Sequence, residues 1–218
     1  QRIVAISDVH LGYGTTRPTL ARYVDKINDL EADVVVIVGD LIDNSILPVA
    51  KADMCREFER VDARYGIYMA AGNHEYISGI EECRNYLQTT PIQLISDSIA
   101  SPVDGVSIVC RDDRHNRSRK SLDTLLKGHN MKEFVVVLDH QPNAIRESSK
   151  NGADLHLSGH THRGQIFPLN LLTDHLFEQS HGYRKWGDTH AYVMTGLSLW
   201  GPPFRIGTHS EMLVVDVV

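Results

Sequence analysis

The sequence has few of the residues on which disulfide-rich and nucleic-acid-binding proteins depend. It contains only three cysteines, Cys55, Cys83 and Cys110, which lie far apart and form no CxxC pair. A disulfide scaffold and a locally spaced thiolate metal site are therefore excluded. Aromatic residues make up only 7% of the chain, and acidic residues outnumber basic ones by 28 to 22. We expect no nucleic-acid partner, because such proteins need a basic face or a stripe of aromatic and basic residues.

Long hydrophobic runs are also missing. The longest, Val34–Val38 and Phe134–Leu138, are far shorter than the roughly 20 residues that span a bilayer. No signal peptide is visible either. We therefore expect a cytoplasmic protein. Because the chain opens with Gln1 and a strand follows at once, the alternative is membrane association through an N-terminal segment that this sequence lacks.

The 218 residues predict a single domain, 1–218, of the α/β class. Short runs rich in Val and Ile, bounded by Gly, Asp or Pro, predict strands at residues 2–7, 34–38, 67–71, 106–110, 134–138, 155–158, 191–195 and 212–218. Apolar residues at helical spacing predict helices within residues 20–30, 54–65, 80–87, 122–126 and 143–150. This alternation is typical of two sheets packed face to face with helices outside, a four-layer α/β/β/α sandwich.

Polar side chains follow five of the predicted strands at the point where each strand ends. They are Asp8-Val9-His10, Gly39-Asp40 with Asp43 beyond it, Gly72-Asn73-His74-Glu75, Asp139-His140, and Gly159-His160-Thr161-His162. Each motif alone is weak evidence, since a Gly-Asp pair after a strand is more often a turn. Ligands of α/β proteins, however, bind outside the carboxyl ends of the strands. Five such segments on one rim therefore predict a binding site.

The residue types in these segments indicate metal binding. Imidazoles and carboxylates without thiolates suit Mn²⁺, Fe or Zn²⁺ better than a Ca²⁺ or Mg²⁺ cage. Seven candidate ligands are too many for one ion with an open position, and they suit two ions about 3.5–4 Å apart that share a carboxylate. We expect the glycines before Asp40, Asn73 and His160 to permit sharp turns and to leave room for a substrate.

The order of these motifs resembles the calcineurin-like metallophosphoesterase superfamily, and the resemblance covers nearly the whole chain. The segments Leu157-Ser158-Gly159-His160-Thr161-His162-Arg163-Gly164-Gln165-Ile166, Cys110-Arg111-Asp112-Asp113 and Gly201-Pro202-Pro203-Phe204-Arg205-Ile206-Gly207 are similar to a narrower branch, the YkuE/YaeI-type bacterial phosphoesterases. Two positions depart from that branch. Arg163 stands where Gly is usual, and Glu75 stands where Asp is commoner; we expect neither to touch a metal ligand.

The resemblance implies a role for each residue of the motifs. The first of two divalent ions would be held by Asp8, His10 and His162, the second by Asn73, His140 and His160, with Asp40 bridging both. Mn²⁺ is the ion expected first, with Fe or Zn²⁺ as alternatives. The catalytic residues would be His74, which contacts the phosphoryl oxygen or protonates the leaving group, and Asp43, which orients it.

The same resemblance implies hydrolysis of a phosphodiester or pyrophosphate bond. A lipid-linked substrate such as UDP-2,3-diacylglucosamine is the leading candidate, with peripheral membrane contact. The rivals are a phosphomonoesterase or nucleotide phosphodiesterase acting on soluble phosphorylated small molecules, and a non-catalytic scaffold of the same fold.

Arg163 and Arg205 are candidate substrate-binding residues, although Arg205 suits a structural salt bridge equally well. Residues 166–186 carry eight large apolar side chains without a clean helix or strand period. They predict an apolar wall beside the metals, or else a small satellite core under a long loop. The basic run at residues 111–120 is read as a solvated loop, with an anionic-lipid or phosphate contact as the alternative.

Overall fold

The computed structural model describes residues 1–218 and contains two β-sheets. The first sheet has the order β11-β1-β2-β3-β4, in which β1 to β4 are parallel and β11 is antiparallel to β1. Its strands are β1 (Arg2–Ile6), β2 (Val34–Val38), β3 (Ile67–Ala70), β4 (Ile92–Ile95) and β11 (Leu213–Asp216).

The second sheet has the order β5-β6-β7-β8-β10-β9, with a parallel centre and one antiparallel strand at each edge. Its strands are β5 (Ser98–Val103), β6 (Val106–Cys110), β7 (Phe134–Leu138), β8 (Leu155–Ser158), β9 (Gly182–Trp186) and β10 (Thr189–Val193).

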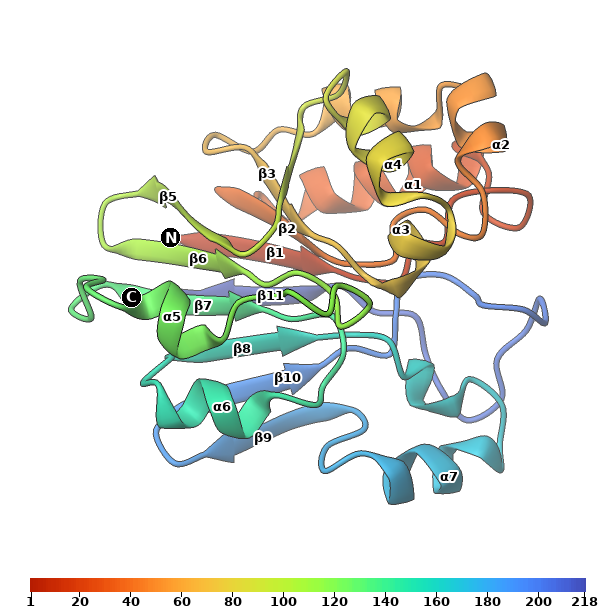
Figure 1. Ribbon diagram of the computed structural model, residues 1–218. Helices are drawn as coiled ribbons and strands as arrows, with labels where there is room; N and C mark the ends of the chain where they lie inside the picture. The colour runs from red at the N-terminus through yellow and green to blue at the C-terminus, as the bar shows by residue number, and fades with distance from the viewer.

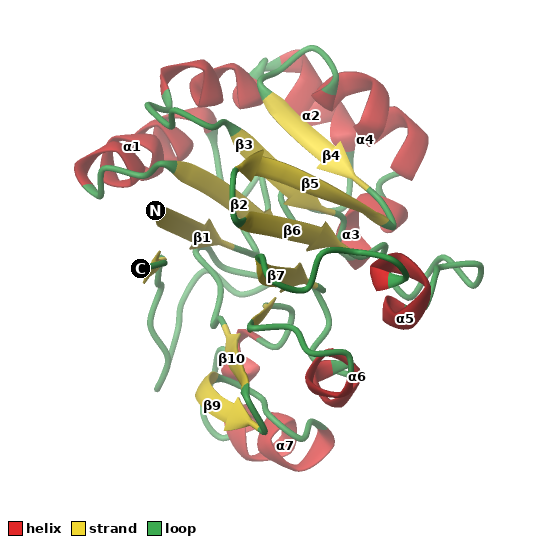
Figure 2. Ribbon diagram, turned by 90° about the vertical axis from the view of Figure 1, so that its left-hand side faces the viewer, coloured by secondary structure: helices red, strands yellow, loops and turns green.

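Helices cover the outer face of each sheet (Figures 1 and 2), which confirms the four-layer α/β/β/α arrangement. On the first sheet lie α1 (Arg17–Asp29), α2 (Ile46–Lys51), the 3₁₀ helix Met54–Arg60 and α4 (Ile80–Leu87). On the second lie α5 (Leu122–Leu126) and α6 (Ile145–Lys150). Two helices stand at the ends of strands, α3 (Asn73–Ile77) and, after the 3₁₀ turn His162–Gly164, α7 (Leu169–Leu176). No helix is long and apolar enough to cross a bilayer.

The core lies in layers between these elements. Alternate residues of each central strand point to opposite faces, so Ile3 and Val36 of the first sheet meet Ile108 and Val136 of the second, while Val35 packs under the helices. Side chains on both faces of these strands are buried from solvent, which explains why β2 consists entirely of Val and Ile. The three cysteines are buried and unpaired, as small apolar residues of the core.

The strands with continuous apolar runs and the helices at residues 80–87 and 122–126 were predicted correctly, whereas several other partly exposed elements were missed. The strands β2, β6, β7 and β8 have the predicted bounds, whereas β10 begins two residues before the predicted one. The predicted helix at residues 54–65 is a 3₁₀ helix that ends at Arg60. The elements β4, β5, β9, α2, α3 and α7 were not predicted from the sequence.

The parallel strands of both sheets end at the same side of the molecule (Figure 1). The loops after β1, β2 and β3 therefore meet the loops after β7 and β8, and these five loops carry the polar motifs found in the sequence.

Candidate metal centre

The loops that carry the polar motifs have strained backbones. Asp8, His10, Asp40, His160 and His162 all adopt positive φ, between 47° and 71°, and they make up half of the ten non-glycine residues that do so. Such conformations are unfavourable for side chains with a Cβ and cluster at functional sites. The strain brings these side chains out of the strand direction and toward one another.

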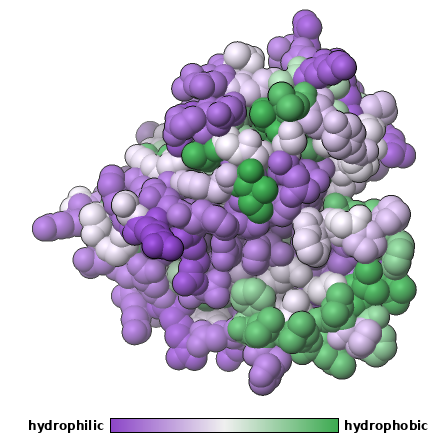
Figure 3. All heavy atoms as spheres, turned by 45° about the vertical axis from the view of Figure 1, so that its right-hand side comes forward, coloured by the Kyte–Doolittle hydropathy of each residue, from purple (hydrophilic) through white to green (hydrophobic).

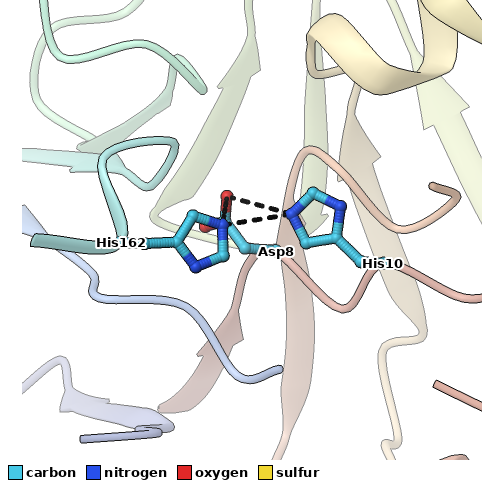
Figure 4. A group of neighbouring side chains, drawn as sticks. All are labelled: Asp8, His10 and His162. Carbon is cyan, nitrogen blue, oxygen red and sulfur yellow. Dashed lines mark hydrogen bonds and ion pairs between the residues drawn. The ribbon is translucent and has the colours of Figure 1, made fainter. Parts of the chain in front are cut away.

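The first three predicted ligands converge on one point (Figure 4). The Nε2 atom of His162 lies 3.4 Å from Oδ1 of Asp8, and Nε2 of His10 lies 3.9 Å from the same oxygen. The two Nε2 atoms are 3.1 Å apart. All three side chains are buried, and the amide of His160 donates to the Asp8 carboxylate at 3.0 Å and fixes it. Two imidazoles and one carboxylate thus face a shared position from three sides.

The second group forms around Asp40. Oδ2 of Asp40 lies 3.0 Å from Nε2 of His140, and His160 completes a trio with them. The other ring nitrogen of His140, Nδ1, donates to the carbonyl oxygen of Val38 at 2.8 Å, which leaves the Nε2 lone pair directed at the site. Asn73 contributes an Oδ1 atom that is buried and has no hydrogen-bond partner.

Asp40 lies between the two groups, because it also forms a cluster with His10 and His74. This is the place that a bridging carboxylate would occupy. The residues present fit a pair of cations, since the lone pair on Nε2 of His140 and the free Oδ1 of Asn73 are buried acceptors without a donor. The predicted residues for the first ion are Asp8, His10 and His162, and those for the second are Asn73, His140 and His160.

The protonation states suit metal binding at two of the imidazoles. Burial lowers the pKa of His160 and of His162 to about 4, so both rings are neutral at pH 7, the form that coordinates a metal. Burial alone would also lower the pKa of His140, but the charge of Asp40 outweighs it and raises that pKa. The negative charge of the Asp40 carboxylate therefore requires a positive charge beside it, which either a proton on His140 or a bound cation supplies.

His74 and Asp43 are also brought together. Oδ1 of Asp43 lies 3.2 Å from Nδ1 of His74 and 3.3 Å from Nδ1 of His10, so one carboxylate orients both a candidate catalytic imidazole and a candidate ligand. Burial opposes a charge on His74, but Asp43 and Asp40 outweigh it and raise its pKa. Burial likewise opposes the Asp43 charge, yet both imidazoles hold its pKa well below the usual range. The contact with His10 was not predicted from the sequence.

The glycines of the motifs make room for the ligand side chains themselves, which corrects the expectation that they make room for substrate. A Cβ on Gly72 would collide with Oδ1 of Asp40, and a Cβ on Gly159 would collide with Oδ2 of Asp8. Each glycine therefore lets a carboxylate of one loop lie flat against the backbone of another.

Glu75 corrects a second expectation, that it touches no metal ligand. Its side chain is fully buried and accepts hydrogen bonds from the amides of Asp40 at 3.0 Å, Ile42 at 3.0 Å and Gly72 at 2.7 Å. It therefore ties the loop after β2 to the loop after β3. The signal in the sequence was its place three residues into α3, where a glutamate commonly bonds backbone amides at a helix start.

A cavity of about 320 Å³ opens directly onto these residues. One wall consists of polar residues of the metal centre, among them His10, Asp40 and His74. Four apolar side chains, Leu169, Leu172, Phe177 and Trp200, line the same cavity and form its apolar wall. Three of the four come from the apolar segment 166–186, which here contains the helix α7 and the strand β9 and is not an irregular loop.

Neither arginine predicted to bind substrate lines this cavity. Arg205 instead donates to the carbonyl oxygens of Thr195, Gly196 and Ser198 and to Oγ1 of Thr208, so all four N–H groups of Nη1 and Nη2 are used. We therefore assign it a structural role. The backbone of Arg163 has positive φ, and its amide donates to Oγ1 of Thr161 at 3.1 Å.

Comparison with known proteins shows the family to which the chain belongs. A model of the calcineurin-like phosphoesterase family matches residues 1–164. An uncharacterised metallophosphoesterase of Helicobacter pylori is 32% identical over 217 residues, which cover 97% of this chain and 58% of that protein. The uncharacterised metallophosphoesterase YkuE of Bacillus subtilis is 28% identical over 230 residues, covering 98% and 77%. A 5'-nucleotidase precursor of Thermus thermophilus shares the fold, with a TM-score of 0.54 at 16% identity over 90% of this chain and 49% of that one.

The chain therefore belongs to the calcineurin-like phosphoesterase family, whose members depend on a dinuclear metal centre. Within this family, the chain is similar to YkuE, a protein of the branch that the sequence motifs resemble. It spans a little over half the length of the Helicobacter relative.

Proposed function

We propose that this protein is a metal-dependent phosphoester hydrolase that cleaves a phosphodiester or pyrophosphate bond. The observation that supports the proposal most is that five of the seven potential ligands line one cavity together with His74, while the other two, Asp8 and His140, lie buried beside them. These residues would hold two divalent ions, with Mn²⁺ expected first, and the ions would supply an activated water and neutralise charge on the phosphoryl oxygens.

The residues of the chain supply the remaining chemistry. Asp8 and Asp40 are held by backbone amides, so their carboxylates are preorganised before any ion binds. His74 lies on the cavity wall and has Asp43 behind its Nδ1, which keeps a proton on the ring and directs the opposite edge at the cavity. It is therefore placed to donate to a phosphoryl oxygen or to the leaving oxygen. With every ligand present, nothing in the site favours a non-catalytic scaffold.

We further propose that the substrate carries an apolar group, as a lipid-linked pyrophosphate such as UDP-2,3-diacylglucosamine does. The support is the apolar wall of the cavity that the metal ligands line, to which Leu172 and Phe177 belong. A substrate whose phosphate reaches the metals would place its neighbouring group against this wall. Burying two such side chains contributes roughly 1.5–3 kcal/mol each, which a small soluble substrate could not recover.

The apolar wall continues onto the outside of the molecule. None of the residues of α7 is buried, and Leu171 and Leu176 on its outer side are 60% and 63% exposed. Figure 3 shows a large apolar patch at the lower right of one face, with smaller apolar spots elsewhere on it. Because the patch is continuous with the cavity, we propose that it rests on the bilayer from which a lipid-linked substrate enters.

The test begins with Mn²⁺-loaded protein and three substrates: a phosphomonoester, a small chromogenic diester and a UDP-linked lipid. Hydrolysis of the lipid at the highest kcat/KM supports the proposal, and a preference for the monoester or for a soluble nucleotide diester supports the rival function. No hydrolysis of any of the three would contradict the assignment as a phosphoester hydrolase.

Variants of α7 separate the wall from the outer patch. We expect Leu172→Ser to raise KM for the lipid about tenfold or more while sparing the chromogenic diester. The matched control is Leu171→Ser on the same helix outside the cavity, which should keep the KM measured in detergent micelles but weaken sedimentation with vesicles. Equal effects of both variants on KM, or equal effects of Leu172→Ser on lipid and diester, would contradict the role of the wall.

A further inference from the structure

A second cavity lies outside the carboxyl ends of β6 and β7, apart from the metal centre. Its volume is about 330 Å³, and it is lined chiefly by Arg111, Arg114, Arg117 and Arg119 from the loop after β6, and by Asn143 and Glu147 from the segment after β7. Ligands of α/β proteins bind in crevices of this kind, between the loops that follow neighbouring parallel strands. None of these residues lines the cavity of the metal centre.

Two of the arginines form a fixed floor. The side chain of Arg111 is only 4% exposed, and its Nη1 lies 2.7 Å from Glu147 and 3.3 Å from Asp139. Nη2 of Arg119 lies 2.6 Å from Asp139. These ion pairs hold both guanidinium planes in one orientation, and Nε of Arg111 remains buried without a hydrogen-bond partner. The guanidinium groups of Arg111 and Arg119 are thus fixed in place before any ligand binds, and Nε–H of Arg111 has no acceptor within the protein.

The other two arginines add charge that nothing in the protein offsets. Arg114 and Arg117 are exposed and form no ion pair with any carboxylate. The nearby acids are already occupied, because Asp112 accepts from Tyr76 and from the side chain of Asn116. Asp113 likewise accepts from His115 and Gln141. Of the acidic side chains, only Glu147 lines the cavity, and it is paired with Arg111.

From this arrangement we propose that the arginine-lined cavity is a second anion site, which binds a phosphate group independently of the metal centre. Guanidinium groups match the oxygens of phosphate in pairs of parallel hydrogen bonds, and several arginines around one concavity select a multiply charged oxyanion over a single carboxylate. The side-chain amide of Asn143, which has no partner within the protein, adds a neutral donor at the rim. The phosphate can belong to a soluble molecule or to a lipid headgroup, which share this chemistry.

The test measures binding of radiolabelled inorganic phosphate to Mn²⁺-loaded protein by equilibrium dialysis. We expect two phosphates per chain, one at the metal centre and one among the arginines. The R114Q/R117Q variant should bind one phosphate, or bind the second at least tenfold more weakly, while R114K/R117K, which keeps the charge, should lose less. The control R22Q/R64Q removes two exposed arginines elsewhere on the surface and should still bind two.

Vesicle sedimentation identifies the source of the phosphate. If R114Q/R117Q sediments less with vesicles of phosphatidic acid in phosphatidylcholine, but as before with phosphatidylcholine alone, the site takes a lipid headgroup. If only the binding of free phosphate falls, the ligand is soluble. The proposal is overturned if wild-type protein binds a single phosphate, or if R114Q/R117Q binds both phosphates with unchanged affinity. Hydrolysis of the chromogenic diester by R114Q/R117Q should be unchanged, so failure of this proposal is distinguishable from failure of the proposed catalytic function.

Discussion

The close approach of Asp40 to Gly72 leads to a sharp prediction for the substitution Gly72→Ala. The backbone of Gly72 has φ −106° and ψ −174°, an extended conformation that alanine adopts without strain. Any effect must therefore come from the added methyl group. Its carbon would lie 2.6 Å from the backbone nitrogen of Asp40 and 2.9 Å from Cδ2 of His140, where ordinary contacts begin at 3.4 Å.

Two predicted metal ligands must therefore move by at least about half an ångström. Crowding of this kind in a packed site costs roughly 1–3 kcal/mol. Part of that cost appears only when metal is bound, because the ions demand the original positions of Asp40 and His140. We expect Gly72→Ala to weaken metal binding by about 10–100-fold, the loss typical when the support of a ligand is disturbed. The melting temperature should fall by about 2–4 °C for each kcal/mol lost.

The assay is Mn²⁺ binding by titration calorimetry together with thermal unfolding in the presence and absence of Mn²⁺. The matched control is Gly14→Ala, because a Cβ at Gly14 meets no atom within 4 Å and the residue does not have positive φ. It should bind metal like the wild type. If Gly72→Ala binds Mn²⁺ within twofold of the wild type, Asp40 and His140 do not hold metal in the positions seen here.

Three other substitutions test separate parts of the structure. His74→Ala should keep both metals by elemental analysis but lose about 10²–10⁴-fold in kcat, and loss of a metal would make His74 a ligand. His156 is buried, and burial lowers its pKa to about 4, so its neutral form stabilises the fold above pH 6.5 and this stability is lost as the pH falls toward 4. His156→Gln should therefore flatten the fall in unfolding free energy between pH 7 and pH 5, and an unchanged slope would contradict this. Arg205→Ala should lower stability by at least about 3 kcal/mol in urea unfolding without a selective rise in KM, whereas raised KM at unchanged stability would restore a role in substrate binding.

The sequence identified most of the metal centre because its ligands follow buried strands. The strand β2 is apolar on both faces, so its end at Val38 and the polar residues after it are unambiguous. The same holds for β7 and His140. Since parallel strands place their carboxyl ends at one rim, these residues could be brought together without knowledge of the loops.

The sequence could not show how the loops themselves are held. Glu75 reaches across to the loop after β2, and that contact depends on the sheet order and on the exact start of α3. The contact between Asp43 and His10 likewise joins two loops whose backbones leave the strand direction through positive φ at His10 and Asp40. Local sequence patterns carry no information on such distances.

The segment 166–186 shows why the outer elements were misjudged. In α7, Leu169, Leu172 and Leu176 recur at helical spacing, but the helix has only eight residues, fewer than the stretch over which a helical period becomes clear. An amphipathic helix normally buries its apolar side, yet no residue of α7 is buried. Leu169 and Leu172 line the cavity of the metal centre, and Leu171 and Leu176 are exposed outside it. An exposed apolar surface of this kind marks an interaction site, because contact with water alone would not select it.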